Sequence, residues 1–286
     1  MTGKFVVVTG ANQGLGYAAS REFAKKGCNL VLVCRDRARG QLAVESIVKE
    51  SGNDNVTLMI CDTSSLRSIN NFSQEYIRTG NPIDVLVNNA GVMRPFENSV
   101  DGYELNFATN TLGYYALTKA LEPALKKSNA ARVIFVSSGG ALTEPLVIDD
   151  LEGATIQSKS NFPESQYARD KRRQIAICEG LAREWAATNI SVYVMHPGWC
   201  DTAGVRSSMP DFYSRFQNSL RTVEQGADTV IWLGLVDRTR LTSGEFYFDR
   251  AIQAKHLPLC ATGYSDAEVK RLMEKLDVYI RRVVVE

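Results

Sequence analysis

The chain has 286 residues, of which 44% are hydrophobic and 23% are charged, and its formal net charge is +1. These proportions are typical of a globular protein and exclude a disordered one. A net charge so close to zero creates no field that would attract nucleic acid or an anionic membrane, so we expect neither as a partner. The longest late apolar run, residues 230–236, is far shorter than the roughly 20 residues that a membrane-spanning helix needs.

The cysteines and histidines indicate no disulfide framework and no metal site. The six cysteines are scattered without any C-x-x-C pair: Cys28, Cys34, Cys61, Cys178, Cys200 and Cys260. Most lie in or beside apolar runs, where a thiol behaves as a small buried hydrophobe. The only histidines, His196 and His256, are far apart, which leaves too few clustered ligands for zinc. Reduced thiols, and a first strand that begins at residue 5 with no signal peptide before it, predict a cytoplasmic protein.

Short apolar runs alternate with longer helical patterns along the chain. Strands are predicted at 5–8, 29–34, 56–60, 85–87, 132–137 and 191–195, and helices at 16–26, 37–50, 66–79, 102–127 and 165–188. Most of the strands are continuously apolar, which is typical of a parallel sheet covered on both faces. An edge strand at 246–248 and a helix at 266–282 complete the pattern. We therefore expect an α/β fold in one domain spanning 1–286, a Rossmann-type doubly wound parallel sheet of about seven strands with helices on both faces.

Two segments, 139–164 and 201–220, have no clear period, and each follows a predicted strand. Open α/β sheets bind ligands at the carboxyl ends of their strands. Met209, Phe212 and Phe216 give 201–220 a loose helical spacing, and we interpret this segment as a substrate lid. These side chains would either line an apolar pocket or pack the lid on the body.

A glycine-rich loop joins the first predicted strand to the first helix. Gly10 would permit the tight turn, Gly14 would let the main chain approach a pyrophosphate, and Gly16 would let the helix pack closely on the sheet. The amino end of the helix would face the anion. The loop residues predicted to bind a nucleotide are Gly10, Asn12, Gln13, Gly14, Leu15 and Gly16.

The second predicted strand ends at Cys34 and is followed by Arg35 and Asp36. A carboxylate at the strand tip would bind the ribose 2′-hydroxyl of NAD, whereas an arginine nearby suits the 2′-phosphate of NADP. Arg35 therefore favours NADP(H), with NAD as the alternative cofactor. Asp36 is expected to cap the next helix.

Tyr167 and Lys171 are four residues apart in a predicted helix and would share one face of it. A nearby ammonium favours the phenolate, so Lys171 would lower the pKa of Tyr167 from about 10. Tyr167 could then exchange a proton with a carbonyl or alcohol oxygen. Ser138 follows a predicted strand and could bind the same oxygen. Asn110 lies inside a predicted helix, where asparagine is unfavourable unless it holds a bend or a water.

Together these motifs resemble the short-chain dehydrogenase/reductase family over nearly the whole chain. The Gly-x-x-x-Gly-x-Gly loop, the Asn-Asn-Ala-Gly segment at 88–91 and the Pro-Gly pair at 197–198 are similar to signatures of that family. The resemblance implies hydride transfer between a nicotinamide and a carbonyl or alcohol. One departure is Gln13, where members that prefer NADP often have a basic residue.

The resemblance also implies roles for individual residues. The implied catalytic residues are Asn110, Ser138, Tyr167 and Lys171. Asn110 would fix a water in a proton relay, and Lys171 would also bind the nicotinamide ribose. The other residues implied to contact the cofactor are Asp62 at the adenine, then Asn89, Ala90, Gly91 and Tyr167, and Pro197, Gly198 and Thr202 at the nicotinamide carboxamide.

Segments 106–113, 136–140, 195–199, 225–229 and 256–259 are further similar to the dehydrogenase/reductase member 12 group of this family, near the retinol-dehydrogenase-like reductases. The apolar side chains of the predicted lid suggest a small hydrophobic carbonyl or alcohol substrate, such as an aldehyde, quinone, steroid or retinoid. His196 is interpreted as a structural neighbour of the site.

Two other functions are compatible with parts of the sequence. A nucleotide-binding regulatory protein with little or no turnover would need only the glycine loop, and the Tyr167–Lys171 pair argues against it. An epimerase or dehydratase would more often have Gly-x-x-Gly-x-x-Gly and a longer substrate domain. Related enzymes are often homodimers or homotetramers, joined through helices equivalent to 102–127 and 165–188. The charged run 171–173 would make that surface less apolar, so the oligomeric state stays open.

Overall fold

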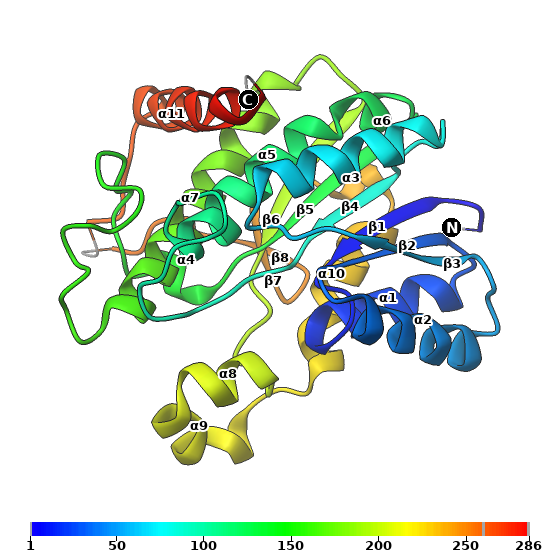
Figure 1. Ribbon diagram of the computed structural model, residues 1–286, viewed down its shortest axis with the longest axis horizontal. Helices are drawn as coiled ribbons and strands as arrows, with labels where there is room; N and C mark the ends of the chain where they lie inside the picture. The colour runs from blue at the N-terminus through cyan, green and yellow to red at the C-terminus, as the bar shows by residue number, and fades with distance from the viewer. Residues whose placement is uncertain (1, 259–260, 285–286) are drawn as a thin grey trace.

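The protein is an α/β fold built on one eight-stranded sheet (Figure 1). The computed structural model describes residues 2–258 and 261–284, so Leu259 and Cys260 lie outside the described residues. The strand order is β3-β2-β1-β4-β5-β6-β7-β8. Strands β1 to β7 pair in parallel, and β8 pairs antiparallel with β7. The predicted Rossmann-type, doubly wound sheet is confirmed.

The strands are β1 (Phe5–Thr9), β2 (Asn29–Cys34), β3 (Val56–Ile60), β4 (Val85–Asn88), β5 (Ala131–Val136), β6 (Ile190–Met195), β7 (Phe246–Phe248) and β8 (Ala251–Gln253). The predicted strand at 246–248 is present as β7, but β8 occupies the edge of the sheet. All three residues of β8 are exposed. Strand β8 was not predicted, because an exposed three-residue strand carries no run of apolar residues.

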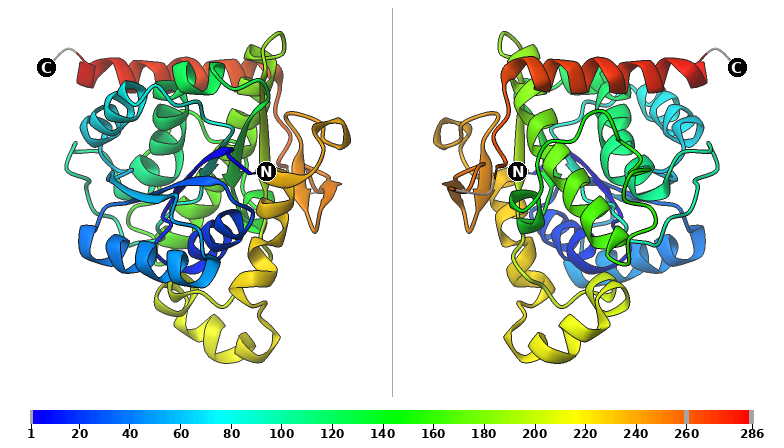
Figure 2. Two further views of the ribbon diagram at one scale, coloured as in Figure 1. Left: turned by 90° about the vertical axis from the view of Figure 1, so that its right-hand side faces the viewer. Right: turned by 90° about the vertical axis from the view of Figure 1, so that its left-hand side faces the viewer.

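Helices cover both faces of the sheet (Figure 2). One layer consists of α1 (Gly14–Lys25), α2 (Arg37–Ser51) and α10 (Val223–Leu235). The other layer consists of α3 (Leu66–Arg78), α5 (Gly113–Ala120) and α7 (Phe162–Glu184), and α11 (Asp266–Val284) lies across α7 and α3. The apolar residues form two clusters, and β1 shows why: Val7 belongs to one cluster while Val6 and Val8 belong to the other, since successive side chains of a strand point to opposite faces.

The single helix predicted at 102–127 is wrong. The structure divides this stretch into α4 (Leu105–Phe107), a π-helical turn η1 (Ala108–Leu112), α5 and α6 (Glu122–Lys126). The boundary before α6 follows from Pro123, whose ring lacks an N–H donor and is tolerated only in the first turn of a helix. The π-helical turn has no comparable signal in the sequence.

The segment 201–220 forms α8 (Ala203–Ser208), α9 (Pro210–Phe216) and a short turn η3 (Gln217–Ser219), which project away from the sheet in Figure 1. No residue of these three elements is buried. Two further short turns are η2 (Gly139–Leu142) and η4 (Arg238–Arg240). Within the described ranges, none of the helices combines the length and apolar character needed to cross a membrane. The described cysteines are all buried, as predicted: Cys28, Cys34, Cys61, Cys178 and Cys200.

Candidate active site

The residues singled out from the sequence converge on one edge of the sheet. Strands β1, β2, β4, β5 and β6 are parallel, so their carboxyl ends lie on the same side, and the strand order reverses between β1 and β4. Such a reversal is where open α/β sheets bind ligands. Gly10, Arg35, Asn89, Ser138 and Pro197 each follow one of these ends. The fold therefore gathers five segments that are far apart in the chain.

The glycine loop adopts a conformation that requires glycine. The φ angles of Gly10 and Gly14 are 62° and 57°, in the left-handed region that glycine enters without a steric penalty. A Cβ on Gly16 would lie 2.4 Å from the carbonyl oxygen of Gly10, so only glycine lets α1 begin this close to the turn. A Cβ on Gly14 would meet only Thr202, at 3.9 Å. Among the described residues, the main chain at Gly14 therefore has no close neighbour on this side other than Thr202.

The amino end of α1 is suited to an anion. Its N-cap residue Gln13 makes no side-chain hydrogen bond to the first turn, and the first turn contains no acidic residue. The main-chain N–H groups of this turn, together with the positive end of the helix dipole, are therefore available to a pyrophosphate. The residues present fit the phosphates of a dinucleotide.

Thr9 and Asn89 fasten the glycine loop to the end of β4. The main-chain N–H groups of Asn89 and Ala90 donate to Thr9 Oγ1 at 2.9 and 3.0 Å. The Asn89 side-chain amide donates in turn to the carbonyl oxygen of Thr9 at 2.9 Å. Asn89 and Ala90 thus shape the loop from the neighbouring strand. Thr9, which was not predicted as a site residue, is the centre of the connection.

The end of β2 separates the roles of Arg35 and Asp36. Asp36 caps α2, because its Oδ1 accepts from the N–H of Arg39 and its Oδ2 from Arg39 Nε, both at 3.0 Å. This agrees with the predicted cap. Arg35 is exposed and makes no hydrogen bond or ion pair with any other described residue. At the end of β3, Asp62 Oδ1 accepts from the N–H and the hydroxyl of Ser64, at 2.9 and 2.7 Å.

Tyr167 and Lys171 lie on one face of α7, next to the end of β5. Lys171 Nζ is 5.2 Å from the centre of the Tyr167 ring and 5.4 Å from that of Tyr114. Lys171 is buried, and its Nζ donates to the carbonyl oxygen of Val136 at 2.8 Å. A Cβ on Gly91 would lie 3.8 Å from the same Nζ. The loop after β4 therefore passes directly beside the lysine.

Burial dominates the protonation of this pair. It raises the pKa of Tyr167 to about 12, with the Ser138 hydroxyl acting in the opposite direction. It lowers the pKa of Lys171 to about 7, although the negative charge of Asp170 opposes this change. The expected depression of the Tyr167 pKa is therefore wrong for the protein without cofactor, because burial of the phenol disfavours its charged form. The phenol is protonated at neutral pH and can act as an acid.

The two serines at the end of β5 face different ways. Ser137 is buried, and its hydroxyl donates to the carbonyl oxygen of Lys171 at 2.9 Å. Ser138 is only partly buried and accepts from the N–H of Gly140 at 3.2 Å. His196 Nδ1 accepts from the N–H of Gly139 at 2.9 Å, and burial lowers the pKa of His196 to about 4. A neutral His196 thus supports the turn that carries Ser138.

Asn110 lies at the centre of the π-helical turn η1. Its side chain makes a pair of hydrogen bonds to Val92, accepting from the N–H at 3.0 Å and donating to the carbonyl oxygen at 2.8 Å. Its own carbonyl oxygen accepts from Gln174 Nε2 at 2.6 Å. Of the two alternatives for a helical asparagine, the structure favours a residue that holds an irregular turn and the loop after β4.

The segment after β6 contacts both ends of the segment 201–220. Gly198 has a φ of 79°, and a Cβ there would lie 2.7 Å from Arg221 Nε. The Arg221 main chain pairs with Trp199 and Asp201, each at 2.8 Å. Thr202 caps α8 by accepting from the N–H of Val205 at 3.2 Å. The beginning and end of segment 201–220 are therefore held together beside Pro197 and Gly198.

Aromatic side chains line up along the projecting segment. The ring centres of Trp199 and Phe212 are 4.5 Å apart, and those of Phe212 and Phe216 are 4.9 Å apart. Trp199 is 49% exposed and Phe216 is 41% exposed, so much of this apolar surface faces solvent. Ser208 at the end of α8 donates to the carbonyl oxygen of Met93 at 3.0 Å, which connects α8 to the loop after β4.

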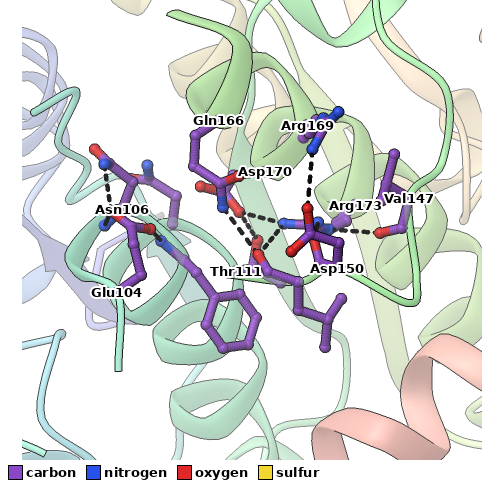
Figure 3. A network of polar contacts seen from close by, with 12 residues as sticks. Glu104, Asn106, Thr111, Val147, Asp150, Gln166, Arg169, Asp170 and Arg173 are labelled. Atoms are coloured by element: carbon purple, nitrogen blue, oxygen red, sulfur yellow. Dashed lines mark hydrogen bonds and ion pairs between the residues drawn. The ribbon is translucent and has the colours of Figure 1, made fainter. Parts of the chain in front are cut away.

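Behind the site, α7 carries a buried polar network (Figure 3). Arg173 binds Asp170 Oδ1 at 2.9 Å and the carbonyl oxygens of Val147, Asp150 and Leu151 at 2.8 to 3.1 Å. Asp170 also accepts from the Thr111 hydroxyl at 2.6 Å.

The interpretation of 171–173 as a charged surface is therefore wrong. Lys171, Arg172 and Arg173 are all buried. Arg172 binds the carbonyl oxygens of Lys255 and Thr262. Each of the three side chains thus has hydrogen-bond partners inside the protein, which a run of charged residues in the sequence does not reveal.

Glu104, at the other end of the network, should make stability depend on pH. Its carboxylate caps α4 by accepting from the N–H groups of Asn106 and Phe107, at 2.9 and 2.7 Å. Burial raises its pKa from 4.5 to about 7, against the effect of these donors, and the charge of Asp170 adds to the increase. The folded chain therefore keeps a proton that the unfolded chain has lost. The free energy of unfolding should fall as the pH rises from 4.5 to about 7.

Urea unfolding at about pH 5 and about pH 8 measures this effect. In Glu104→Gln the fall in stability should be smaller by on the order of 2 kcal/mol, because the variant cannot ionise. Glu97→Gln, at an exposed glutamate seven positions earlier, should keep the wild-type pH dependence. Equal pH dependence in wild type and Glu104→Gln would contradict the prediction.

Several residues that shape the site were not identified from the sequence. They are Thr9, Glu104, Asp170, Arg173, Gln174 and Arg221. Asp170 to Gln174 form five consecutive polar residues in the middle of α7, and all are buried. Such a run normally indicates a solvent-exposed stretch, so only the packing around α7 could identify its role.

Comparison with known proteins shows what this chain is similar to. A family model described as short chain dehydrogenase matches residues 4–147. Dehydrogenase/reductase SDR family member 12 of Bos taurus is 45% identical, over 98% of this chain and 87% of the relative. Human retinol dehydrogenase 11 is 32% identical, over 87% of this chain and 78% of the relative.

Solved structures share the fold. An uncharacterized protein from Mycobacterium paratuberculosis superposes with a TM-score of 0.75 at 25% identity, covering 96% of this chain and 93% of that one. A short chain dehydrogenase from Shigella flexneri, complexed with NADP, gives a TM-score of 0.69 at 23% identity, covering 86% and 96% of the two chains.

Proposed function

Because the chain belongs to the short-chain dehydrogenase family, we propose that it transfers a hydride between NADP(H) and a hydrophobic carbonyl or alcohol, with Tyr167 as the general acid and base. The observation that carries the proposal is the position of Tyr167 and Lys171 on one face of α7, with Lys171 Nζ 5.2 Å from the phenol ring. Ser138 lies beside Tyr167, and the loop after β4 lies beside Lys171.

The proposed chemistry divides between cofactor and protein. When bound, the nicotinamide supplies or accepts the hydride. In the reductive direction Tyr167 donates its phenolic proton to the carbonyl oxygen, while Ser138 holds that oxygen by a hydrogen bond. A pKa of about 12 keeps the phenol protonated at neutral pH. In the oxidative direction the phenolate takes the proton of the alcohol, and a charged Lys171 stabilises that phenolate.

The proposed cofactor sites follow the edge of the sheet. The glycine loop and the amino end of α1 would hold the pyrophosphate. Asp62 would contact the adenine, Lys171 the nicotinamide ribose, and Pro197, Gly198 and Thr202 the carboxamide. A preference for NADP(H) over NAD(H) is supported by Arg35, which has no partner among the described residues, and by Asp36, whose carboxylate is engaged by Arg39.

Arg35→Ala should reduce that preference. Loss of a phosphate-binding guanidinium is expected to weaken NADPH binding by about tenfold and leave NADH binding nearly unchanged. Isothermal titration calorimetry with both cofactors measures the ratio. Arg78→Ala, at an exposed arginine in the last turn of α3, is the control and should leave the ratio at its wild-type value. An unaltered ratio in Arg35→Ala would exclude Arg35 as its source.

The hydrophobic character of the substrate is supported by the lid. We propose that 201–220 forms a lid on a single domain spanning 1–286, with Met209, Phe212 and Phe216 facing the substrate. Aldehydes, quinones, steroids and retinoids fit such an apolar wall. The test is a panel of these carbonyls, and of the corresponding alcohols, followed by NADPH absorbance. No turnover with any of them, despite tight NADPH binding, would instead support a nucleotide-binding regulatory protein.

A further inference from the structure

Gln174 is a fully buried glutamine whose two amide ends contact two different parts of the candidate site. Its Nε2 donates to the carbonyl oxygen of Asn110 at 2.6 Å, and its Oε1 accepts from Lys171 Nζ at 3.4 Å. It lies on α7, whereas Asn110 lies in the π-helical turn η1. Gln174 therefore connects the lysine of one helix to the main chain of another element.

The orientation of the Gln174 amide is determined by its partners. Lys171 Nζ can only donate and the Asn110 carbonyl can only accept. With the amide reversed, the NH₂ group would face the ammonium and the oxygen would face the carbonyl, so both contacts would become repulsive. In a site without exposure to water, such an arrangement would carry a large energetic cost. The oxygen of the Gln174 amide must therefore face Lys171, and its nitrogen must face the Asn110 carbonyl.

We propose that Gln174 is a positioning residue that holds the Lys171 ammonium in the site by bridging it to the main-chain carbonyl of Asn110. An ammonium has three N–H donors. One binds the Val136 carbonyl oxygen at 2.8 Å and a second binds Gln174. The third remains for a ligand. The inference rests on the proposed function for the role of Lys171, although the bridge itself does not.

The bridge also extends to the loop that borders the lid. Asn110, whose carbonyl is held by Gln174, binds both main-chain groups of Val92 through its side chain. The next residue, Met93, accepts from Ser208 of α8. Gln174 thus connects the lysine, through Asn110 and the loop after β4, to α8 of the proposed lid.

The charge on Lys171 should respond to Gln174. The titratable groups facing the lysine are Tyr114 from α5 and Tyr167 and Asp170 from α7. From β5 and η1 it meets carbonyl groups, that of Val136 directly and that of Asn110 through Gln174. Because burial already lowers the pKa of Lys171 to about 7, an acceptor such as Gln174 Oε1 helps to keep the amine protonated near neutrality.

Substitutions at Gln174 should change the Lys171 pKa in opposite directions. Gln174→Met keeps the length of the side chain but removes the acceptor, and should lower the pKa of Lys171 by about 0.5 to 1. Gln174→Glu places a carboxylate beside the amine and should raise it. The measurement is an NMR titration of lysine side-chain nitrogen in the cofactor-free, ¹⁵N-lysine-labelled protein, with the signal assigned by its loss in Lys171→Met.

Gln166→Met is the matched control. Gln166 is a fully buried glutamine on the same helix, two turns earlier, and its amide donates to the carbonyl oxygen of Leu151 instead. This variant should leave the Lys171 pKa unchanged. An unchanged pKa in folded Gln174→Met, or an equal change in Gln166→Met, would overturn the proposal. If Gln174→Met does not fold, Gln174→Glu decides, and a Lys171 pKa that does not rise overturns it.

Turnover supplies a second readout, separate from the first. With a substrate from the panel, Gln174→Met should lower kcat about 5- to 10-fold with little change in KM. The pH at which the rate of alcohol oxidation rises should also be higher in this variant, because a less charged Lys171 stabilises the Tyr167 phenolate less. A wild-type protein without turnover, but with the predicted Lys171 titrations, would contradict the proposed function while supporting the Gln174 bridge.

Discussion

Replacing Tyr167 by phenylalanine is expected to lower kcat for carbonyl reduction by about 10²- to 10⁴-fold, the usual contribution of a positioned general acid. The centre of the Tyr167 ring lies 5.2 Å from Lys171 Nζ, and the high pKa of the phenol keeps its proton in place at neutral pH. NADPH binding should change little, since the glycine loop, Arg35 and the amino end of α1 are untouched. Steady-state NADPH absorbance and calorimetry measure the two effects separately.

Tyr193→Phe is the control for Tyr167→Phe. Tyr193 is a fully buried tyrosine in β6, and its hydroxyl has no hydrogen-bond partner among the described residues. Removing that hydroxyl should leave both kcat and NADPH binding near their wild-type values. If Tyr167→Phe retains more than about a tenth of wild-type kcat, the proton has another donor and the assignment of Tyr167 is wrong.

Arg173→Met is expected to destabilise the fold by about 3 to 5 kcal/mol, because it leaves the buried Asp170 carboxylate without its cation. Arg173 is fully buried and also binds three carbonyl oxygens of the 147–151 segment. Figure 3 shows the guanidinium between Asp170 and that segment. Urea unfolding followed by far-ultraviolet circular dichroism measures the free energy of unfolding.

Arg183→Met is the control for Arg173→Met, because it removes an exposed ion pair from the same helix. Arg183 pairs with Asp266 at 2.6 Å, with 47% and 85% of the two side chains exposed, and its loss should cost about 0 to 1 kcal/mol. The double variant Asp170→Asn, Arg173→Met should be more stable than Arg173→Met alone, since no unpaired buried charge remains. A double variant that is less stable would show that the carbonyl contacts of Arg173, not its pairing with Asp170, dominate.

Local sequence was sufficient where a residue acts through its own chain neighbours. The glycine loop was predicted because the positive φ angles of Gly10 and Gly14 are local properties of the chain, and because a Cβ on Gly16 would collide with the carbonyl oxygen of Gly10 within the same loop. Asp36 was predicted as a cap because it binds a residue three positions later. The spacing of Tyr167 and Lys171 was informative because residues four apart on a helix share a face.

The sequence by itself determined seven of the eight strands, the glycine loop and the order of the candidate site residues, since runs of apolar residues and the positions of glycine are local properties. Only the tertiary structure decided what the polar run 170–174 does. Burial makes those side chains depend on partners from β5, η1 and the 147–151 segment, and makes Arg172 depend on the carbonyl oxygens of Lys255 and Thr262. Burial also reversed the expected change in the pKa of Tyr167. Desolvation depends on what surrounds a group in space, and adjacent letters do not specify that.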